Sequence, residues 1–195
     1  MCGIAGFSSY EEDYGICRGK WEEILETMNQ VQKRRGPDED GIFLDAHCGM
    51  AHVRLCILDL KRGQQPMSRH SQGRTCTICF NGEIYNMKAL RKELEAEGAI
   101  FQSDSDTEVF LVGYMLHGEN FVKRINGVFG AALWDSDKET LFLFRDRAGV
   151  KPLFYTKYRE TLVYASELKG ILAYPGMEAV ALSLIHISEP TRRTP

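Results

Sequence analysis

The chain has 195 residues, of which 44% are hydrophobic, and this is enough to form one packed globular domain. Its 24 basic and 27 acidic residues give a formal net charge of -3, and it has no Lys/Arg run long enough to bind nucleic acid or a membrane surface. The sequence shows neither a basic leader followed by an apolar segment nor a run of about 18 apolar residues. We therefore expect a soluble, cytoplasmic domain without nucleic-acid or membrane partners.

The first half of the chain alternates short apolar runs with one periodic segment. Residues 3–7 predict a buried strand that begins almost at the amino terminus. Apolar side chains spaced by three and four between residues 20 and 33 predict an amphipathic helix, which Gly36 and Pro37 end. Further strands are predicted at 41–44, 49–58 and 75–80, the last ended by a turn at Asn81 and Gly82.

The second half begins with helices and ends with strands. Helices are predicted at 87–97 and 106–116. Closely spaced strands at 127–134, 140–145, 153–155 and 161–164 are typical of an antiparallel meander. Strands, helices and strands again predict an α+β fold, a four-layer αββα sandwich of two antiparallel sheets flanked by helices.

The six cysteines are predicted to be free thiols, because the sequence has no signal for an oxidising compartment. Cys76 and Cys79 form a CxxC pair within an apolar run, where residues three apart on a strand point to opposite faces. No second Cys/His pair provides two more ligands, so we predict no metal site.

Cys2 follows the initiator methionine directly and precedes the small Gly3. Excision of Met1 would therefore leave a thiol and a free α-amine on one residue. An α-amine titrates at about 7.7 to 8.0 and a thiol at about 8.5, so the amine can accept the thiol proton near neutral pH. A buried structural cysteine near the terminus is the alternative interpretation.

Several motifs occur in a fixed order along the chain. They are CGIAGF at 2–7, RGPD at 35–38, Arg54-Leu55 with Asp59, NGEIYN at 81–86, SDTE at 105–108, GVFGAALWD at 127–135, RDRAGVKPLFY at 145–155 and ASE at 165–167. Together they closely resemble the class II glutamine amidotransferases, which are N-terminal nucleophile hydrolases, and NGEIYN and RDRAGVKPL resemble the asparagine synthetase branch. The chain departs from the family at Arg34, where histidine is usual, and at Gly130 and Ala131.

The resemblance implies a reaction centre for glutamine hydrolysis. Cys2 would be the nucleophile, without a metal or cofactor in this half of the protein. The side-chain amide of Asn81 and the backbone N–H of Gly82 would form the oxyanion hole. Taken alone, these two residues are also consistent with a hairpin turn.

The resemblance also implies how L-glutamine is held. Arg54 would bind the α-carboxylate, and Asp106, helped by Glu83, would bind the α-ammonium. The backbone beyond Arg54 would form one wall of the pocket, through Leu55, Cys56, Ile57 and Leu58. Taken alone, Arg54 is also consistent with a surface ion pair, and Asp106 with a helix N-cap.

Other charged and titratable residues are predicted to have structural roles. Arg145, Asp146, Arg147 and Lys151 would form a salt-bridge network or a domain contact. His47, His52 and His117 are predicted to be hydrogen-bonded or solvent-facing rather than catalytic bases.

The reaction implied is hydrolysis of L-glutamine to L-glutamate and ammonia through a thioester on Cys2. In the family, a C-terminal synthetase domain uses the ammonia with ATP and magnesium to convert aspartate to asparagine, and the chain contains no SGGxDS-type pyrophosphate loop for that step. The alternatives are an amidotransferase with another acceptor, a hydrolase of a different amide and a non-catalytic glutamine-sensing module. A second copy of the chain is a further candidate partner.

The last residues differ from the rest. LSLIHISEPTR at 182–192 resembles a translated sequencing adapter, so we expect residues 1–181 to form the amidotransferase domain, with Met1 removed, and 182–195 to be a non-native tail. A frayed native terminus is the alternative. The adapter hypothesis implies that the natural protein continued into the synthetase domain.

Overall fold

The computed structural model describes residues 1–56, 63–71 and 73–179. The strands are β1 (Gly3–Ser8), β2 (Glu39–Leu44), β3 (Cys48–Arg54), β4 (Met67–Ser71), β5 (Arg74–Ile84), β6 (Gly127–Asp135), β7 (Thr140–Arg145), β8 (Phe154–Tyr158) and β9 (Thr161–Ala165). The helices are α1 (Arg18–Gln32), α2 (Met87–Ala96), α3 (Asp106–His117), the 3-10 helix η1 (Gly118–Arg124) and α4 (Leu168–Leu172).

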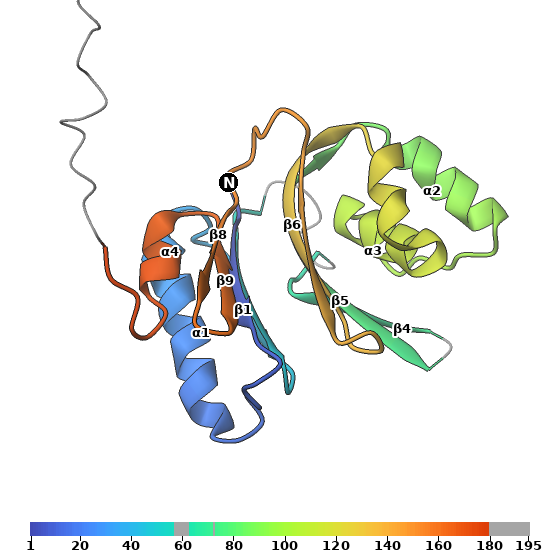
Figure 1. Ribbon diagram of the computed structural model, residues 1–195. Helices are drawn as coiled ribbons and strands as arrows, with labels where there is room; N and C mark the ends of the chain where they lie inside the picture. Colours follow the sequence, from blue (N-terminus) through green and yellow to red (C-terminus); the bar gives the residue numbers. More distant parts are fainter. Residues whose placement is uncertain (57–62, 72, 180–195) are drawn as a thin grey trace, which may run out of the picture.

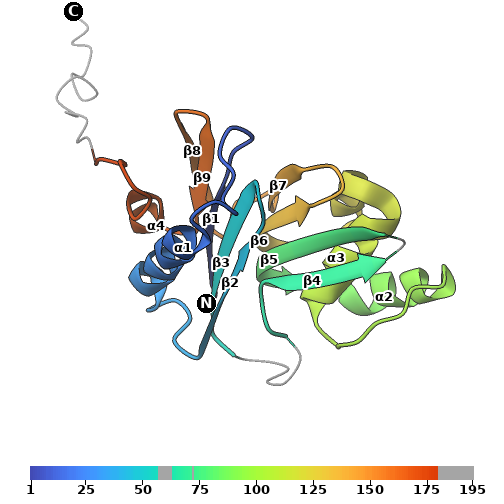
Figure 2. The ribbon, with the colours of Figure 1, turned by 90° about the horizontal axis from the view of Figure 1, so that it is seen from below.

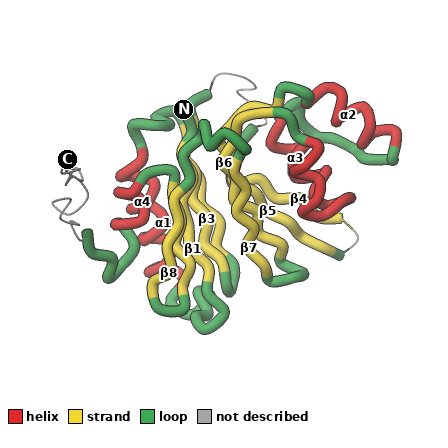
Figure 3. The backbone as a smooth tube through the Cα atoms, turned by 45° about the horizontal axis from the view of Figure 1, so that its top comes forward, coloured by secondary structure: helices red, strands yellow, loops and turns green. Residues whose placement is uncertain are grey.

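The strands form two antiparallel sheets, ordered β2-β3-β1-β9-β8 and β4-β5-β6-β7. The two sheets face each other across a shared core. Helices α1 and α4 lie outside the first sheet, and α2 and α3 lie outside the second (Figures 1 and 3). This arrangement confirms the predicted α+β sandwich. The amino-terminal strand β1 is the central strand of its sheet, between β3 and β9.

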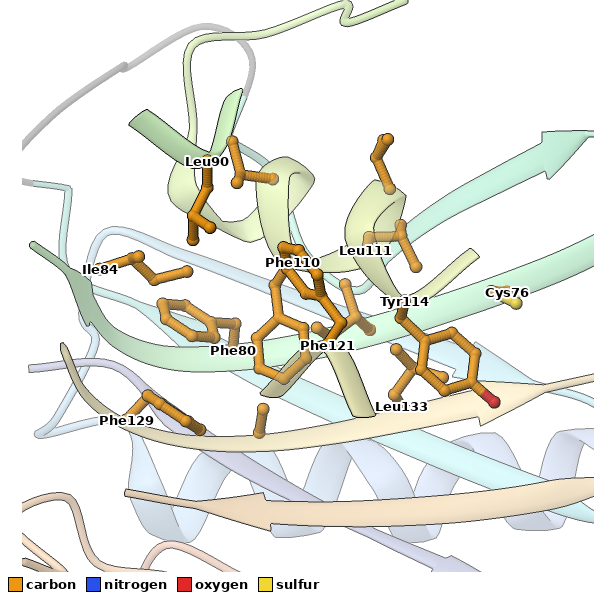
Figure 4. Packing of buried hydrophobic residues seen from close by; sticks show 14 of the residues in the cluster. Cys76, Phe80, Ile84, Leu90, Phe110, Leu111, Tyr114, Phe121, Phe129 and Leu133 are labelled. Carbon is orange, nitrogen blue, oxygen red and sulfur yellow. The ribbon is translucent and has the colours of Figure 1, made fainter. Parts of the chain in front are cut away.

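Side-chain alternation gives each sheet an inner and an outer face. In β1, Ile4 belongs to the core between the sheets, whereas Phe7 packs in the core beneath α1. In β5, Cys79 belongs to the core between the sheets. Cys76 belongs to the core beneath α3, where Figure 4 shows it. The CxxC cysteines therefore point to opposite faces, which confirms the prediction.

Strand β5 does not end at Asn81 and Gly82. It continues to Ile84, and these two residues pair with Gly130 and Phe129 of β6. The predicted turn is therefore wrong. Long pairing with β6 overrides the local turn preference of an Asn-Gly pair, because each further residue in the ladder gains backbone hydrogen bonds and cross-strand contacts.

The predicted meander is also wrong, because β6 and β7 belong to one sheet and β8 and β9 to the other. The connection from β7 to β8 crosses between the sheets beside the amino terminus, as the orange segment of Figure 1 shows. The remaining predicted elements are present with shifted ends, and β3 ends at Arg54. Sequence analysis did not predict β4, η1 or α4. No helix within the described ranges is long and apolar enough to cross a membrane.

Candidate active site

Cys2 lies immediately before β1, whose first residue, Gly3, pairs with Val53 of β3. Alternation places Cys2 on the same inner face as Ile4. The thiol is partly buried, and its Sγ lies 3.9 Å from the carbonyl oxygen of Leu55. The predicted nucleophile therefore reaches the edge of the core between the two sheets.

Residues of two motifs form hydrogen bonds with Cys2 and with the start of β1. Arg35 of the RGPD motif is largely buried; its Nε donates to the carbonyl of Cys2 at 2.9 Å, and its guanidinium pairs with Glu167 at 3.3 Å. Ser166 of the ASE motif accepts a hydrogen bond from the N–H of Ile4 at 3.0 Å and donates its own N–H to the Ile4 carbonyl at 2.8 Å. Sequence analysis recognised both motifs but assigned neither residue this role.

Arg54 ends β3 on the same inner face. Its side chain is only 7% exposed, and its guanidinium donates to Glu39 Oε2 at 2.7 Å. The alternative prediction of a surface ion pair is therefore right that Arg54 forms an ion pair, but wrong that Arg54 lies at the surface. Arg54 and Glu39 line a cleft of about 250 Å³ with His52, Gln65 and neighbouring residues.

The backbone after β3 is fixed by the RGPD motif. Asp38 accepts from the N–H of Cys56 at 2.7 Å and donates its own N–H to the Arg54 carbonyl at 3.1 Å. A Cβ on Gly36 would lie 2.4 Å from the Arg54 nitrogen, so only glycine fits there. Leu55 and Cys56 thus lie beside Cys2 and Arg54, whereas the predicted wall residues Ile57 and Leu58 are outside the described residues.

Asn81 lies on the inner face of β5, two residues after Cys79. It is 2% exposed, and its Nδ2 has no hydrogen-bond partner within the described part of the chain. A buried amide group without a partner is costly, so it commonly marks a ligand position. Asn81 therefore provides a hydrogen-bond donor that faces the first sheet.

Gly82 provides a second donor. The hydrogen-bonding alternation of the ladder directs the N–H groups of Phe80, Gly82 and Ile84 away from β6. The first of these donates to Gln65 Oε1 and the last to Asp106 Oδ2, while the N–H of Gly82 has no partner among the described residues. A Cβ on Gly82 would lie 2.4 Å from the Val128 carbonyl oxygen, so a side chain is excluded.

Two carboxylates complete this end of β5. Asp106 is the first residue of α3, but the N-cap is Ser105, whose hydroxyl accepts from the N–H of Glu108 at 3.2 Å, so the N-cap alternative for Asp106 is wrong. Burial raises the pKa of Asp106, against the hydrogen bond from Ile84, and the nearby Glu83 carboxylate adds to the rise. The two acidic groups are close enough to interact, and they would favour a cation between them.

The Cys2 and Asn81 ends meet at one edge of the sandwich. Gly130 pairs with Asn81, and a Cβ on Gly130 would lie 3.9 Å from the Cβ of Lys151. The Lys151 ammonium in turn lies 3.6 Å from the sulfur of Met1. Figure 2 shows the amino terminus beside the ends of β2 and β3. Cys2, Arg54 and Asn81 therefore all lie on the faces that the two sheets turn towards each other.

The loop of the RDRAGVKP motif closes this edge. Burial alone would raise the pKa of Asp146, but hydrogen bonds from the backbone of Val150 and Lys151 outweigh burial and hold that pKa below its usual value. Arg145 donates to the carbonyls of Lys151 and Gly149. The structure therefore confirms structural roles for Arg145 and Asp146, through backbone hydrogen bonds in place of the predicted salt bridges, while the domain contact stays a prediction.

The three histidines considered above are not arranged to act as general bases. Burial lowers the pKa of His52 to about 3, so its ring is neutral at physiological pH. His47 Nδ1 lies within 3.1 Å of the Ser9 carbonyl, and His117 lies 2.9 Å from Glu97. These contacts confirm hydrogen-bonded roles for His47 and His117, whereas His52 is buried without a side-chain partner among the described residues.

All six cysteines lie within the described ranges, and each is unpaired. The same ranges contain no group of three or more His, Cys, Asp or Glu side chains arranged to hold a metal ion.

Comparison with known proteins identifies this arrangement. The glutamine amidotransferase domain family matches residues 1–188. The chain belongs to this family. Among curated proteins, asparagine synthetase [glutamine-hydrolyzing] 3 of Bacillus subtilis is 41% identical over 179 residues, covering 92% of this chain and 28% of that protein. Asparagine synthetase B of Escherichia coli is 37% identical, covering 88% and 30%. This amidotransferase domain thus spans less than a third of the length of either relative.

The fold has a counterpart among solved structures. Glutamine phosphoribosylpyrophosphate amidotransferase from B. subtilis superposes with a TM-score of 0.72 at 22% identity, covering 88% of this domain and 43% of that chain. This likeness supports the sandwich of two sheets flanked by helices. The curated relatives given above are named as glutamine-hydrolysing asparagine synthetases.

Proposed function

We propose that this amidotransferase domain hydrolyses L-glutamine to L-glutamate and ammonia, with Cys2 as the nucleophile after removal of Met1. The observation that supports the proposal is a partly buried Cys2 thiol on the inner face of the first sheet together with two donors on β5 of the facing sheet, Asn81 Nδ2 and the N–H of Gly82, that have no partner within the part of the chain that the structure describes. A nucleophile facing two hydrogen-bond donors is what acyl transfer requires.

In the proposed first step the α-amine of Cys2 accepts the thiol proton, and Sγ attacks the γ-carboxamide carbon. Asn81 and Gly82 then donate to the oxyanion of the tetrahedral intermediate. On its collapse the C–N bond breaks, the protonated amine gives its proton to the leaving nitrogen as ammonia forms, and a γ-glutamyl thioester remains. Water, deprotonated by the same amine, attacks the thioester; the C–S bond breaks and glutamate leaves.

The charged groups are suited to holding a free amino acid by both ends. Arg54 would bind the α-carboxylate and Asp106, with Glu83, the α-ammonium. Fixing both ends would orient the γ-amide towards Cys2, which lowers the entropic part of the barrier. A clamp of this kind disfavours an amide within a polypeptide, and so argues against a general amide hydrolase.

The greater length of the curated relatives suggests a use for the ammonia. We propose that the ammonia serves a synthetase domain of a longer protein, which would use ATP and magnesium to convert aspartate to asparagine. The names of the relatives support this acceptor, while an amidotransferase with another acceptor is the second candidate, since amidase chyE of Penicillium rubens is also 35% identical over 182 residues. Cytoplasmic location and a second copy as partner stay predictions.

The test is mass spectrometry of the purified chain after treatment with 6-diazo-5-oxo-norleucine, an electrophilic glutamine analogue. We expect Met1 to be absent and a single adduct on Cys2 that excess glutamine prevents. Cys17, which is exposed and unpaired, is an internal control for non-specific alkylation. Retained Met1 without an adduct would contradict the proposal and favour a glutamine-sensing module. Calorimetry would then detect the binding of glutamine by that module.

A further inference from the structure

The residue that would bind the substrate α-carboxylate already has an anionic partner. Arg54 donates to Glu39 Oε2 at 2.7 Å, and the side chains are 7% and 33% exposed. Such a pair interacts more strongly than one in open solvent, because fewer water molecules screen it. The positive charge of Arg54 is therefore partly neutralised before any substrate arrives.

The fold fixes this pairing in place. Glu39 and Arg54 stand directly opposite each other in the β2–β3 ladder, so their side chains share one face. Next to them, Asp38 donates to the Arg54 carbonyl and accepts from Cys56. The ladder therefore holds the two side chains next to each other, and a carboxylate that binds the Arg54 guanidinium would lie close to the Glu39 carboxylate.

We propose that Glu39 determines substrate affinity by weakening the attraction of Arg54 for the α-carboxylate of glutamine. This inference rests on the proposed function and extends it to a residue that sequence analysis did not single out. Glu39 lines the same cleft of about 250 Å³ as Arg54. Two carboxylates on one guanidinium repel each other, and this repulsion opposes binding of the substrate but not the chemistry at Cys2.

The charge balance of the site has a consequence for specificity. Asp106 and Glu83 provide anionic groups for the α-ammonium end, whereas the α-carboxylate end has the Arg54 guanidinium, which Glu39 shares. Recognition therefore depends more on the α-ammonium than on the α-carboxylate. In L-glutamine α-amide a neutral amide replaces the α-carboxylate, so Glu39 does not repel it. Removal of the Glu39 charge should therefore not improve its binding.

The decisive variant is Glu39→Gln, which keeps an oxygen that accepts from Arg54 but removes the charge. We expect its KM for glutamine to fall about 3- to 10-fold with kcat unchanged, as removal of one charge near a partly buried pair predicts. The KM for L-glutamine α-amide should change by less than about twofold, since it lacks the repelled group. Glu26→Gln, on the exposed face of α1, is the control for net charge.

Calorimetry with L-glutamate, the product, tests the same charge effect without turnover, and Glu39→Gln should bind it more tightly by a similar factor. An unchanged or raised KM and Kd in Glu39→Gln, with wild-type activity intact, would overturn the role of Glu39 and leave the proposed function standing. A lower melting temperature with an unchanged KM would assign the ion pair a structural role only. No hydrolysis and no binding of either amino acid by the wild-type chain would contradict the proposed function itself.

Discussion

The guanidinium of Arg35 donates to the backbone carbonyl of Cys2 at 2.9 Å, so a side chain 33 positions along the chain fixes the residue that carries the nucleophile. Arg35→Lys retains the charge but cannot form both this bond and the pair with Glu167 in the same geometry. We expect kcat to fall about 10- to 100-fold, because small misplacements of a nucleophile have effects of this size. The rate of Cys2 alkylation by the glutamine analogue should fall with it, and an unchanged rate would show that Arg35 only stabilises the fold.

Asn81 is predicted to act on the oxyanion rather than on stability. Because its Nδ2 has no partner in the described structure, Asn81→Ala should lower the free energy of unfolding by about 1 kcal/mol or less. In contrast, kcat should fall about 100- to 1000-fold with little change in KM, the usual effect of removing an oxyanion donor. Urea unfolding and steady-state glutaminase assays on the same preparation measure both. A large loss of stability with modest loss of kcat would reverse this assignment.

The space around Gly82 is predicted to be too small for any side chain. In Gly82→Ala the new Cβ would lie 2.4 Å from the Val128 carbonyl and 2.5 Å from the Phe129 Cβ, so β5 and β6 must move apart. We expect a loss of about 1–3 kcal/mol in the free energy of unfolding, typical of overpacking. A Cβ on Gly19 in α1 would have no heavy atom within 4 Å, so Gly19→Ala should instead stabilise by about 0.5–1 kcal/mol. Urea unfolding of both variants measures the difference, and equal effects at both positions would contradict the steric argument.

His52 gives the domain a defined acid sensitivity. Burial lowers its folded-state pKa to about 3, whereas an unfolded histidine titrates at about 6.5. The unfolded state therefore binds more protons between these values, so stability is greatest above pH 6.5 and decreases as pH falls towards 3, by at most about 1.4 kcal/mol per pH unit from this group. Urea unfolding of wild type and His52→Gln at about pH 7.5, 6.5, 5.5 and 4.5 should show a smaller decrease in the variant. Parallel curves would show that His52 does not titrate in this way.

The sequence predicted most of the elements but not how they connect. Periodicity located α1 and α3, because a buried face repeats along each helix. The turn at Asn81 and the meander were wrong for the same reason: both depend on which strand becomes the neighbour, and the choice of partner is a tertiary property. Strand β4 was missed because MSRHS is polar and lacks apolar alternation.

The site was predicted through family resemblance rather than periodicity. Cys2, Arg54, Asn81 and Asp106 come from separate elements, and no local pattern shows that they meet. The structure places Cys2 beside Leu55, the residue after Arg54, and Asp106 beside the end of β5, the strand that carries Asn81. It also adds Arg35, Glu39 and Ser166, whose roles depend on contacts between distant parts of the chain. Glu39 could have been found only by knowing its register with Arg54, which one sequence does not contain.

The position of β1 has a consequence for folding of the domain. Its Ile4 bonds to Ser166, 162 positions further along the chain, and β1 lies between β3 and β9. β1 therefore acquires its second neighbour only when residues far along the chain are available to pair with it. Such distant pairing slows folding. Cys2, which lies immediately before β1, is therefore fixed between its neighbouring strands only after β9 has paired, late in folding.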